Sequence, residues 1–110
     1  ETKGVLLASR VRKAASVWSR CIGLLGRSSL SAGEGLWLTP CRSVHTFFMR
    51  FPIDVVFVDR NNQIVGLVEN IKPFRLSPLF LKASYAIELP SFTIHNSPAF
   101  LGDQLVLIKD

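Results

Sequence analysis

The sequence predicts one mainly β domain, a β-sandwich or barrel-like fold, with a single α-helix near the N-terminus. From residue 36 onward, apolar side chains recur with a period of two and are rich in β-branched and aromatic types. Turn-forming residues interrupt this pattern at intervals of about 8–12 residues, which is typical of all-β folds. With 110 residues, of which 48% are hydrophobic and 19% charged, the chain has the composition of a single folded domain, residues 1–110.

The N-terminal part predicts a strand and then the helix. A short apolar run at residues 5–8 predicts the first strand, and basic residues follow it. Residues 16–26 predict an amphipathic helix that ends at Gly26. Four of its side chains have the i, i+3, i+4, i+7 spacing of one helix face: Trp18, Cys21, Ile22 and Leu25.

Further strands are expected downstream, each an apolar run bounded by turn residues. They cover residues 36–38, 44–49, 53–58, 64–69, 83–89 and 104–108. Residues 72–82 contain two prolines and five large apolar side chains, so they predict a loop that packs somewhere. This loop is either a lid over the sheet or a binding patch, and the sequence leaves both interpretations open.

A histidine and an aspartate lie inside the most strand-like segment, SVHTFFMRFPIDVVFVD, residues 43–59. If residues 51–52 form a tight hairpin turn, His45 faces Val58, four positions along the strand from Asp54. The two side chains would then be about 13 Å apart, at about 3.3 Å per residue. That distance is too long for an acid–base pair, which needs direct hydrogen-bond contact.

Three residues are nevertheless candidates for catalysis. Asp54 is flanked by aliphatic residues, so we expect internal donors to satisfy its carboxylate, with a catalytic role as the alternative. His45 is suited to orient a loop, bind a ligand or act as a base. Cys41 is a weak candidate nucleophile, since a reactive thiolate needs a neighbouring cation or helix N-terminus.

The net charge of +5 comes from residues 1–30, where six basic side chains face Glu1 alone. This segment is either a solvated face or a surface that docks on an acidic protein or a membrane. We expect no nucleic-acid partner, because Trp18 is the only aromatic residue among these charges.

No apolar run is long enough for a transmembrane segment. We expect a cytoplasmic protein, or a secreted or periplasmic one if a signal peptide precedes Glu1.

No cofactor or metal is expected. Cys21, Cys41, His45 and His95 have no recognised metal-binding spacing, and the glycines at residues 23–26 do not form a nucleotide-binding pattern. Whether Cys21 and Cys41 pair is left open, because two cysteines suit either a disulfide or two ordinary thiols.

The order of several motifs resembles the domain-of-unknown-function family numbered 192 over nearly the whole chain. The motifs are GLLGR (23–27), GEGLWLTPC (33–41), SVHTFFMRFPIDVVFVD (43–59), IVGLVENIKP (64–73), YAIELP (85–90) and GDQLVL (102–107). The resemblance implies a compact, mostly β domain with a helix near the N-terminus, in a bacterial and archaeal family without an assigned activity. The family's recurring features fall on Gly23, Gly35, Met49, Asp54, Glu88, Pro90, Gly102 and Asp103. The chain departs from the family pattern at Ser91-Phe92, where we expect a small residue followed by glycine.

The leading hypothesis is a non-enzymatic binding or accessory protein, with a groove between residues 41–54 and the strand that carries Glu88. Its expected ligand-binding residues are His45, Thr46, Met49, Asp54 and Glu88. The partner is an unidentified small ligand or protein, and we expect a monomer. One alternative is a small hydrolase that uses His45 with Asp54 or Cys41, and the other is docking through the basic N-terminal segment.

Overall fold

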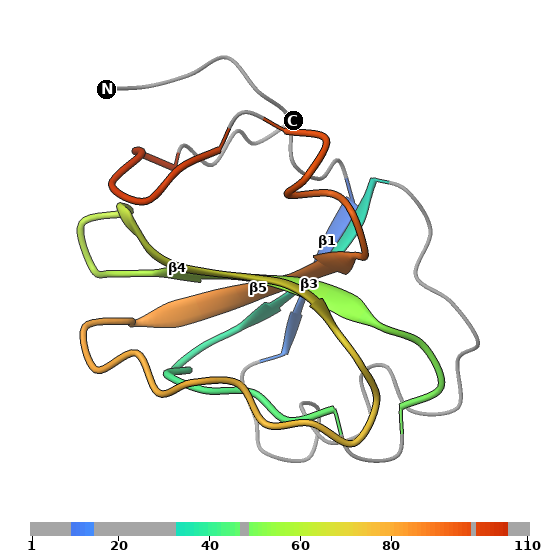
Figure 1. Ribbon diagram of the computed structural model, residues 1–110. Helices are drawn as coiled ribbons and strands as arrows, with labels where there is room; N and C mark the ends of the chain where they lie inside the picture. Colours follow the sequence, from blue (N-terminus) through green and yellow to red (C-terminus); the bar gives the residue numbers. More distant parts are fainter. Residues whose placement is uncertain (1–9, 15–32, 47–48, 98, 106–110) are drawn as a thin grey trace.

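The computed structural model describes residues 10–14, 33–46, 49–97 and 99–105, and within them one five-stranded sheet (Figure 1). The strands are β1 (Arg10–Ala14), β2 (Glu34–Leu38), β3 (Ile53–Val58), β4 (Ile64–Ile71) and β5 (Tyr85–Pro90), in the spatial order β1-β2-β5-β3-β4. β1 is parallel to β2, and the other neighbours are antiparallel. The prediction of a mainly β fold is therefore confirmed. The strand expected at residues 5–8 and the helix expected at residues 16–26 lie outside the described residues.

β3 is the centre of the sheet and matches its predicted bounds. Every one of its six residues is buried, since β4 and β5 flank it and both faces of the sheet are covered. A strand buried on both faces has a continuous apolar sequence, and Val55 to Val58 have that character. The β-branched side chains also suit the pleated backbone. β3 thus provides the scaffold from which side chains project to either side.

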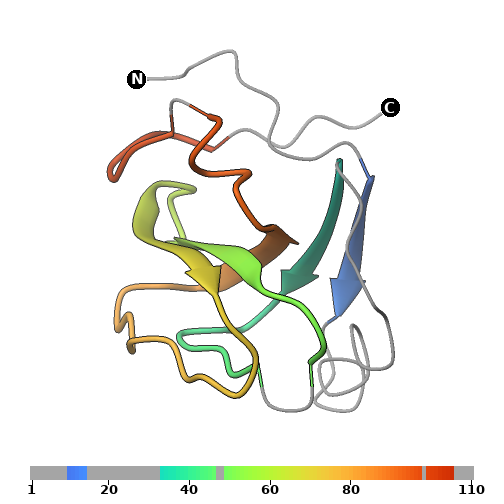
Figure 2. The ribbon, with the colours of Figure 1, turned by 45° about the vertical axis from the view of Figure 1, so that its right-hand side comes forward.

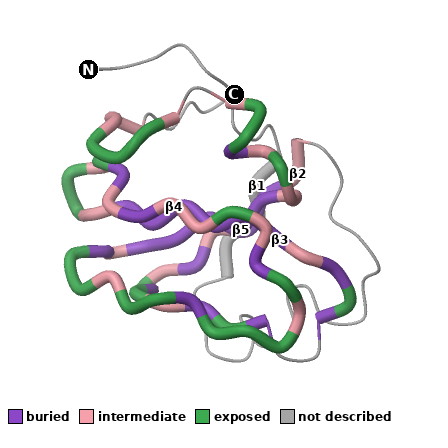
Figure 3. Tube along the Cα trace, viewed as in Figure 1, coloured by how far each residue is buried: buried purple, intermediate pink, exposed green. Residues whose placement is uncertain are grey.

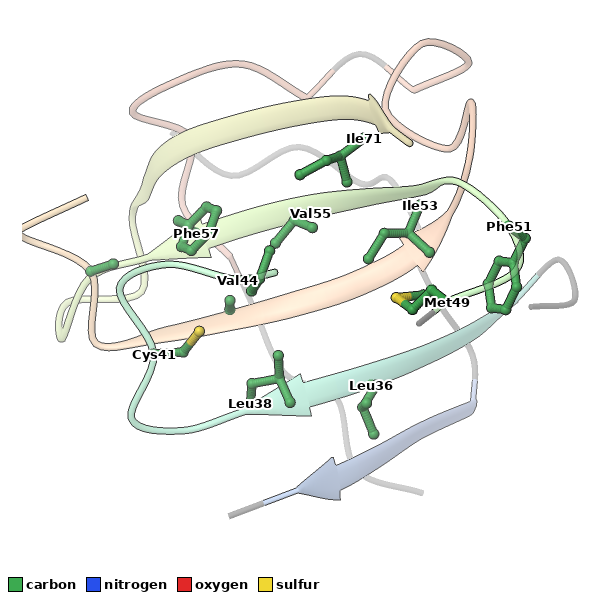
Figure 4. Close-up of a cluster of buried hydrophobic side chains, with 12 residues drawn as sticks. Leu36, Leu38, Cys41, Val44, Met49, Phe51, Ile53, Val55, Phe57 and Ile71 are labelled. Carbon is green, nitrogen blue, oxygen red and sulfur yellow. The ribbon is translucent and has the colours of Figure 1, made fainter. Parts of the chain in front are cut away.

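Alternate residues of β3 enter two separate cores. Ile53, Val55 and Phe57 pack on one face of the sheet, in a cluster under two loops (Figure 4). The first loop covers residues 39–51, of which 39–46 and 49–51 are described, and the second covers residues 72–84. Val56 and Val58 pack on the other face, in a cluster that includes Ile94. Figures 1 and 2 show the same layering, with residues 91–105 on the side of the sheet opposite to residues 72–84.

Of the strand expected at residues 44–49, the described residues 44–46 and 49 lie outside any strand, and they form no hairpin with β3. Both edges of β3 are paired with β4 and β5, so residues 44–49 have no free edge of β3 to join. Residues 42–46 run instead beside residues 74–80, with an antiparallel bridge between His45 and Leu76. The expected face-to-face pairing of His45 with Val58 is therefore wrong, because Val58 pairs with Tyr85 and Ile64.

β1 was not predicted at its observed position. The basic residues 10–14 form a strand that pairs with β2 at the edge of the sheet. Charged residues are common in edge strands, where they oppose further strand pairing. The final strand expected at residues 104–108 is represented within the described residues by one bridge, between Gln104 and Gln63.

Phe80 anchors the loop of residues 72–84 to the sheet. Its ring packs on Phe57 with 4.5 Å between ring centroids. Gly66 on β4 pairs with Phe57 and provides the space for the Phe80 ring. A Cβ atom at position 66 would lie 2.5 Å from Phe80 Cε1, well inside contact distance. The glycine is needed here because another side chain occupies the position of its missing Cβ.

We therefore expect Gly66→Ala to destabilise the fold by about 1–3 kcal/mol, since an added methyl group forces the Phe80 ring off Phe57. Urea denaturation measures the change in the free energy of unfolding. The same substitution in a Phe80→Leu background should cost clearly less, because the smaller side chain leaves room for the methyl group. Equal costs in the two backgrounds would show that Gly66 does not make room for Phe80.

Candidate functional site

The Asp54 carboxylate is fully buried and accepts two hydrogen bonds from backbone amides. Asn70 N–H donates to Oδ1 at 2.7 Å, and Ile94 N–H donates to Oδ2 at 2.8 Å. The side chain has 0% relative exposure. Burial of a carboxylate is costly unless donors of this kind replace water. The carboxylate therefore joins β3 to the end of β4 and to the turn after β5.

Asn70 extends this network to the turn after β5. Its backbone has a φ of 51°, in the left-handed region, which turns its N–H toward Asp54. Its side-chain Oδ1 accepts a hydrogen bond from Ser91 Oγ. Thr93 Oγ1 donates to Pro90 O at 2.7 Å and shapes the same turn. The surroundings of Asp54 are thus interior backbone and neighbouring polar side chains, as expected for an anchor of the fold.

Glu88 is buried on the opposite face of the sheet from Asp54. In the antiparallel pairing of β3 and β5, Glu88 lies opposite Val55 and Asp54 lies opposite Leu89. Side chains alternate between faces along a strand, so Glu88 shares the face of Val55 and Leu36. Asp54 and Glu88, both expected to bind a ligand, therefore lie on opposite faces of the sheet. Met49 is also buried, in the cluster on the Glu88 face (Figure 4).

Thr46 is a hydrogen-bonding centre between two loops. Its hydroxyl donates to Lys72 O, and its oxygen accepts from Arg75 N–H at 2.9 Å. Its backbone N–H donates to Arg75 O, and its carbonyl accepts from Phe74 N–H, both at 2.9 Å. With 0% exposure, Thr46 is a buried polar residue that fixes the path of residues 72–75.

His45 and Cys41 are not brought together with Asp54. His45 is exposed and lies in the loop that covers the face opposite to Asp54. Cys41 is 3% exposed, and its Sγ donates to Ser43 O at 3.2 Å. Across the part of the chain that the structure describes, no three His, Cys, Asp or Glu side chains are grouped to hold a metal ion. The described residues thus contain no His45–Asp54 pair for acid–base chemistry.

The two loops over the first face also expose a set of side chains that, apart from His45, was not among the ligand-binding residues expected from the sequence. We call this surface the loop face and define it by its exposed residues: Arg42, His45, Lys72, Phe74, Arg75, Leu76, Leu79, Leu81 and Lys82. The sequence leaves a lid and a binding patch as alternatives for residues 72–82, and the loop has features of both. Ser77 and Phe80 pack toward the interior, whereas four large apolar side chains are exposed. Figure 3 shows several exposed stretches along the loop between β4 and β5.

Tyr85 has a perturbed pKa whose cause is structural. Burial, together with the nearby Asp59 charge, raises the pKa of its hydroxyl from 10.0 to about 12. The hydroxyl donates to Asn62 Oδ1 at 2.9 Å, at the turn between β3 and β4. Tyr85 packs in the core on the Asp54 face, against Trp37. A perturbed pKa can mark a functional site, but here burial in the core accounts for it.

The fold and these contacts define a small β domain whose buried polar residues hold loops in place. The chain belongs to the family DUF192, described as "Uncharacterized ACR, COG1430", whose family model matches residues 1–107. This agrees with the resemblance seen in the motifs.

Two archaeal relatives have the family name UPF0127. The chain is 30% identical to the UPF0127 protein of Thermococcus sibiricus, over 96% of this chain and 70% of that protein. It is 32% identical to UPF0127 protein PH1112 of Pyrococcus horikoshii, over 96% of this chain and 93% of that protein. A crystal structure of a protein of unknown function from Novosphingobium aromaticivorans has a similar fold, with a TM-score of 0.77. That match is 18% identical and covers 86% of this chain and 71% of the other, so it shows the fold alone.

Within the described ranges, none of the structure is a helix of the length and hydrophobicity needed to cross a membrane.

Asp54→Asn should destabilise the fold by about 1–3 kcal/mol, because the amide NH₂ would face one of the two backbone N–H donors and leave it without an acceptor. Thermal and urea denaturation measure the loss. Glu69→Gln is the matched control, since it removes the same charge from an exposed position of β4 and should change stability by less than about 0.5 kcal/mol. Equal effects of the two variants would contradict the anchoring role of Asp54.

Tyr85 is the only tyrosine, so its ionisation can be followed by tyrosinate absorbance. We expect a midpoint near pH 12 in the folded protein and near 10.0 in denaturant. The folded state favours the neutral phenol, so this contribution to stability is complete below pH 10 and is lost as the pH rises toward 12. Asp59→Asn should lower the folded midpoint. The same midpoint in the folded and denatured protein would contradict the buried environment of the hydroxyl.

Proposed function

We propose that this chain is a non-enzymatic binding domain that recognises its partner through the loop face. The observation that carries the proposal is the difference between the two faces of the sheet: one encloses a buried carboxylate, and the other exposes apolar and charged side chains. On one face, Asp54 is enclosed by backbone donors. On the other, two hydrogen-bonded loops hold His45 and four large apolar side chains at the surface.

This arrangement assigns different roles to the five residues expected to bind a ligand. His45 is exposed and belongs to the loop face, where it is available for direct contact. Thr46 and Met49 support that face from beneath, through hydrogen bonds and through packing. Asp54 and Glu88 are buried in the sheet, and in this proposal they stabilise the domain without touching the ligand.

The hydrolase alternative has less support from the geometry. It requires His45 to act with Asp54 or Cys41, and Asp54 accepts its hydrogen bonds on the far side of the sheet. The Cys41 thiol is buried and hydrogen-bonded to the carbonyl of Ser43, whereas an activated thiolate needs a cationic partner.

The proposal can be tested with anilinonaphthalene sulfonate, an anionic aromatic dye that fluoresces when it binds apolar surface. We expect the native protein to bind the dye and the double variant Leu76→Ser, Leu79→Ser to bind it at least about tenfold more weakly, because the apolar contact area is lost. Circular dichroism verifies that both proteins are folded.

The matched control is Phe100→Ser with Leu101→Ser, on the opposite side of the sheet. These two side chains are 61% and 64% exposed, close to the 69% and 63% of Leu76 and Leu79. The control should leave dye binding unchanged. The loop face is not the recognition surface if the control pair weakens binding as much as the loop pair, or if the native protein binds no dye.

A further inference from the structure

The loop face exposes several cations, and the two chain segments that contain its loops include no acidic residue. Residues 35–53 and 70–87, which contain both loops, include no Asp or Glu. Four cations of the loop face are exposed: Arg42, Lys72, Arg75 and Lys82. Arg50, exposed at the end of the first loop, has the same sign. This surface therefore has a uniformly positive character, although residues 31–110 as a whole carry equal numbers of basic and acidic side chains.

The same surface exposes large apolar side chains between the cations. Phe74 is 58% exposed, Leu76 69%, Leu79 63% and Leu81 68%. Lys72 and Lys82 bound this apolar stretch, and Arg75 lies within it. Soluble proteins seldom place several such side chains together in water without a binding role.

These apolar side chains are exposed although the loop of residues 72–84 is held firmly by hydrogen bonds and packing. Ser77 N–H donates to Val44 O at 2.9 Å, and Val44 N–H donates to Ser77 Oγ at 2.9 Å. Phe80 N–H donates to Arg42 O at 2.8 Å, and the Phe80 ring packs on Phe57. The loop is fixed from the inside, so its backbone loses little conformational freedom when a partner binds.

We propose that the loop face docks on a lipid bilayer that contains anionic headgroups. This rests on the proposed function and names the partner of the same surface. The cations meet the lipid phosphates, and the tips of Phe74, Leu76, Leu79 and Leu81 enter the boundary between headgroups and acyl chains. The charge of the face selects an anionic bilayer over a neutral one.

A bilayer fits this face better than the other anionic partners. It supplies negative charge and an apolar layer directly beneath it over a continuous surface, and so satisfies both kinds of side chain together. A single-stranded nucleic acid would use stacked aromatic side chains, and Phe74 is the one aromatic residue of the loop face as defined. An acidic protein would pair with the cations but would need separate pockets for four apolar side chains.

The test is co-sedimentation of the whole chain with vesicles of equal parts phosphatidylcholine and phosphatidylglycerol, against vesicles of phosphatidylcholine alone. We expect binding to the anionic vesicles that weakens as salt rises, because screening reduces the attraction of the cations. Arg75→Gln with Lys82→Gln should lower the partition coefficient by about fivefold per cation removed. Leu76→Ser with Leu79→Ser should lower it at least about tenfold.

Two matched controls separate this surface from the rest of the chain. Arg10→Gln with Arg12→Gln removes the same charge from the basic N-terminal segment, and Phe100→Ser with Leu101→Ser removes apolar side chains from the other side of the sheet. Both control variants should bind anionic vesicles like the native protein. Equal or greater loss in the Arg10 and Arg12 variant would overturn the proposal in favour of docking through the N-terminal segment.

The remaining outcomes distinguish this inference from the proposed function. Dye binding at the loop face without vesicle binding would overturn the membrane partner and leave the binding surface in place. Loss of the dye site as well would overturn both. Self-association that disappears in the Leu76 and Leu79 variant, measured by analytical ultracentrifugation without lipid, would assign the face to a second copy of the chain and overturn the bilayer proposal.

Discussion

The burial of the Asp54 carboxylate is the constraint on which the rest of the structure depends. A carboxylate with no exposure needs donors for both oxygens, and here they come from Asn70 and Ile94, which are 16 and 40 residues away along the chain. Both segments must approach β3 on the same face. Residues 91–97 are thereby held over that face, and the opposite face is left for the two loops that carry the proposed binding surface.

Thr46, a second buried polar residue, holds those two loops together, as Asp54 holds the segments on its own face of the sheet. Thr46 exchanges hydrogen bonds with Lys72, Phe74 and Arg75, so this one position makes several of the contacts that hold the second loop against the first. Asp54 and Thr46 thus organise opposite sides of the sheet with the same physical rule, that a buried polar group must be satisfied by partners with fixed positions. Both side chains have 0% exposure, and the hydrogen bonds that hold them join them to backbone groups of other segments.

The sequence predicted some of these features and missed others for identifiable reasons. The bounds of β3 and the burial of Asp54 follow from a continuous apolar run, which depends on local composition. Residues 44–49 have strand-like composition, but strand formation depends on an available edge, and β4 and β5 already occupy those of β3. The donors to Asp54 are backbone amides, which have no sequence signature. For the loop face the sequence offered the apolar loop of residues 72–82 as either a lid or a binding patch. The lack of acidic residues beside that loop becomes informative only once residues 42–46 and 74–80 are known to lie together.

Two exposed phenylalanines occupy positions where the stability of the fold does not explain the choice of residue. Phe74 and Phe92 have φ values of 61° and 72°, a left-handed conformation that glycine or asparagine adopts at lower cost. At Phe92 the family resemblance leads us to expect glycine, in agreement with this backbone. Their side chains are 58% and 56% exposed, so burial offsets little of that cost. The two positions differ in their surroundings, since residues 89–105 contain no Lys or Arg, whereas Phe74 lies between Lys72 and Arg75. A bulky apolar side chain held in an unfavourable backbone conformation among cations contributes little to folding, and its contribution is better sought in contacts outside the molecule.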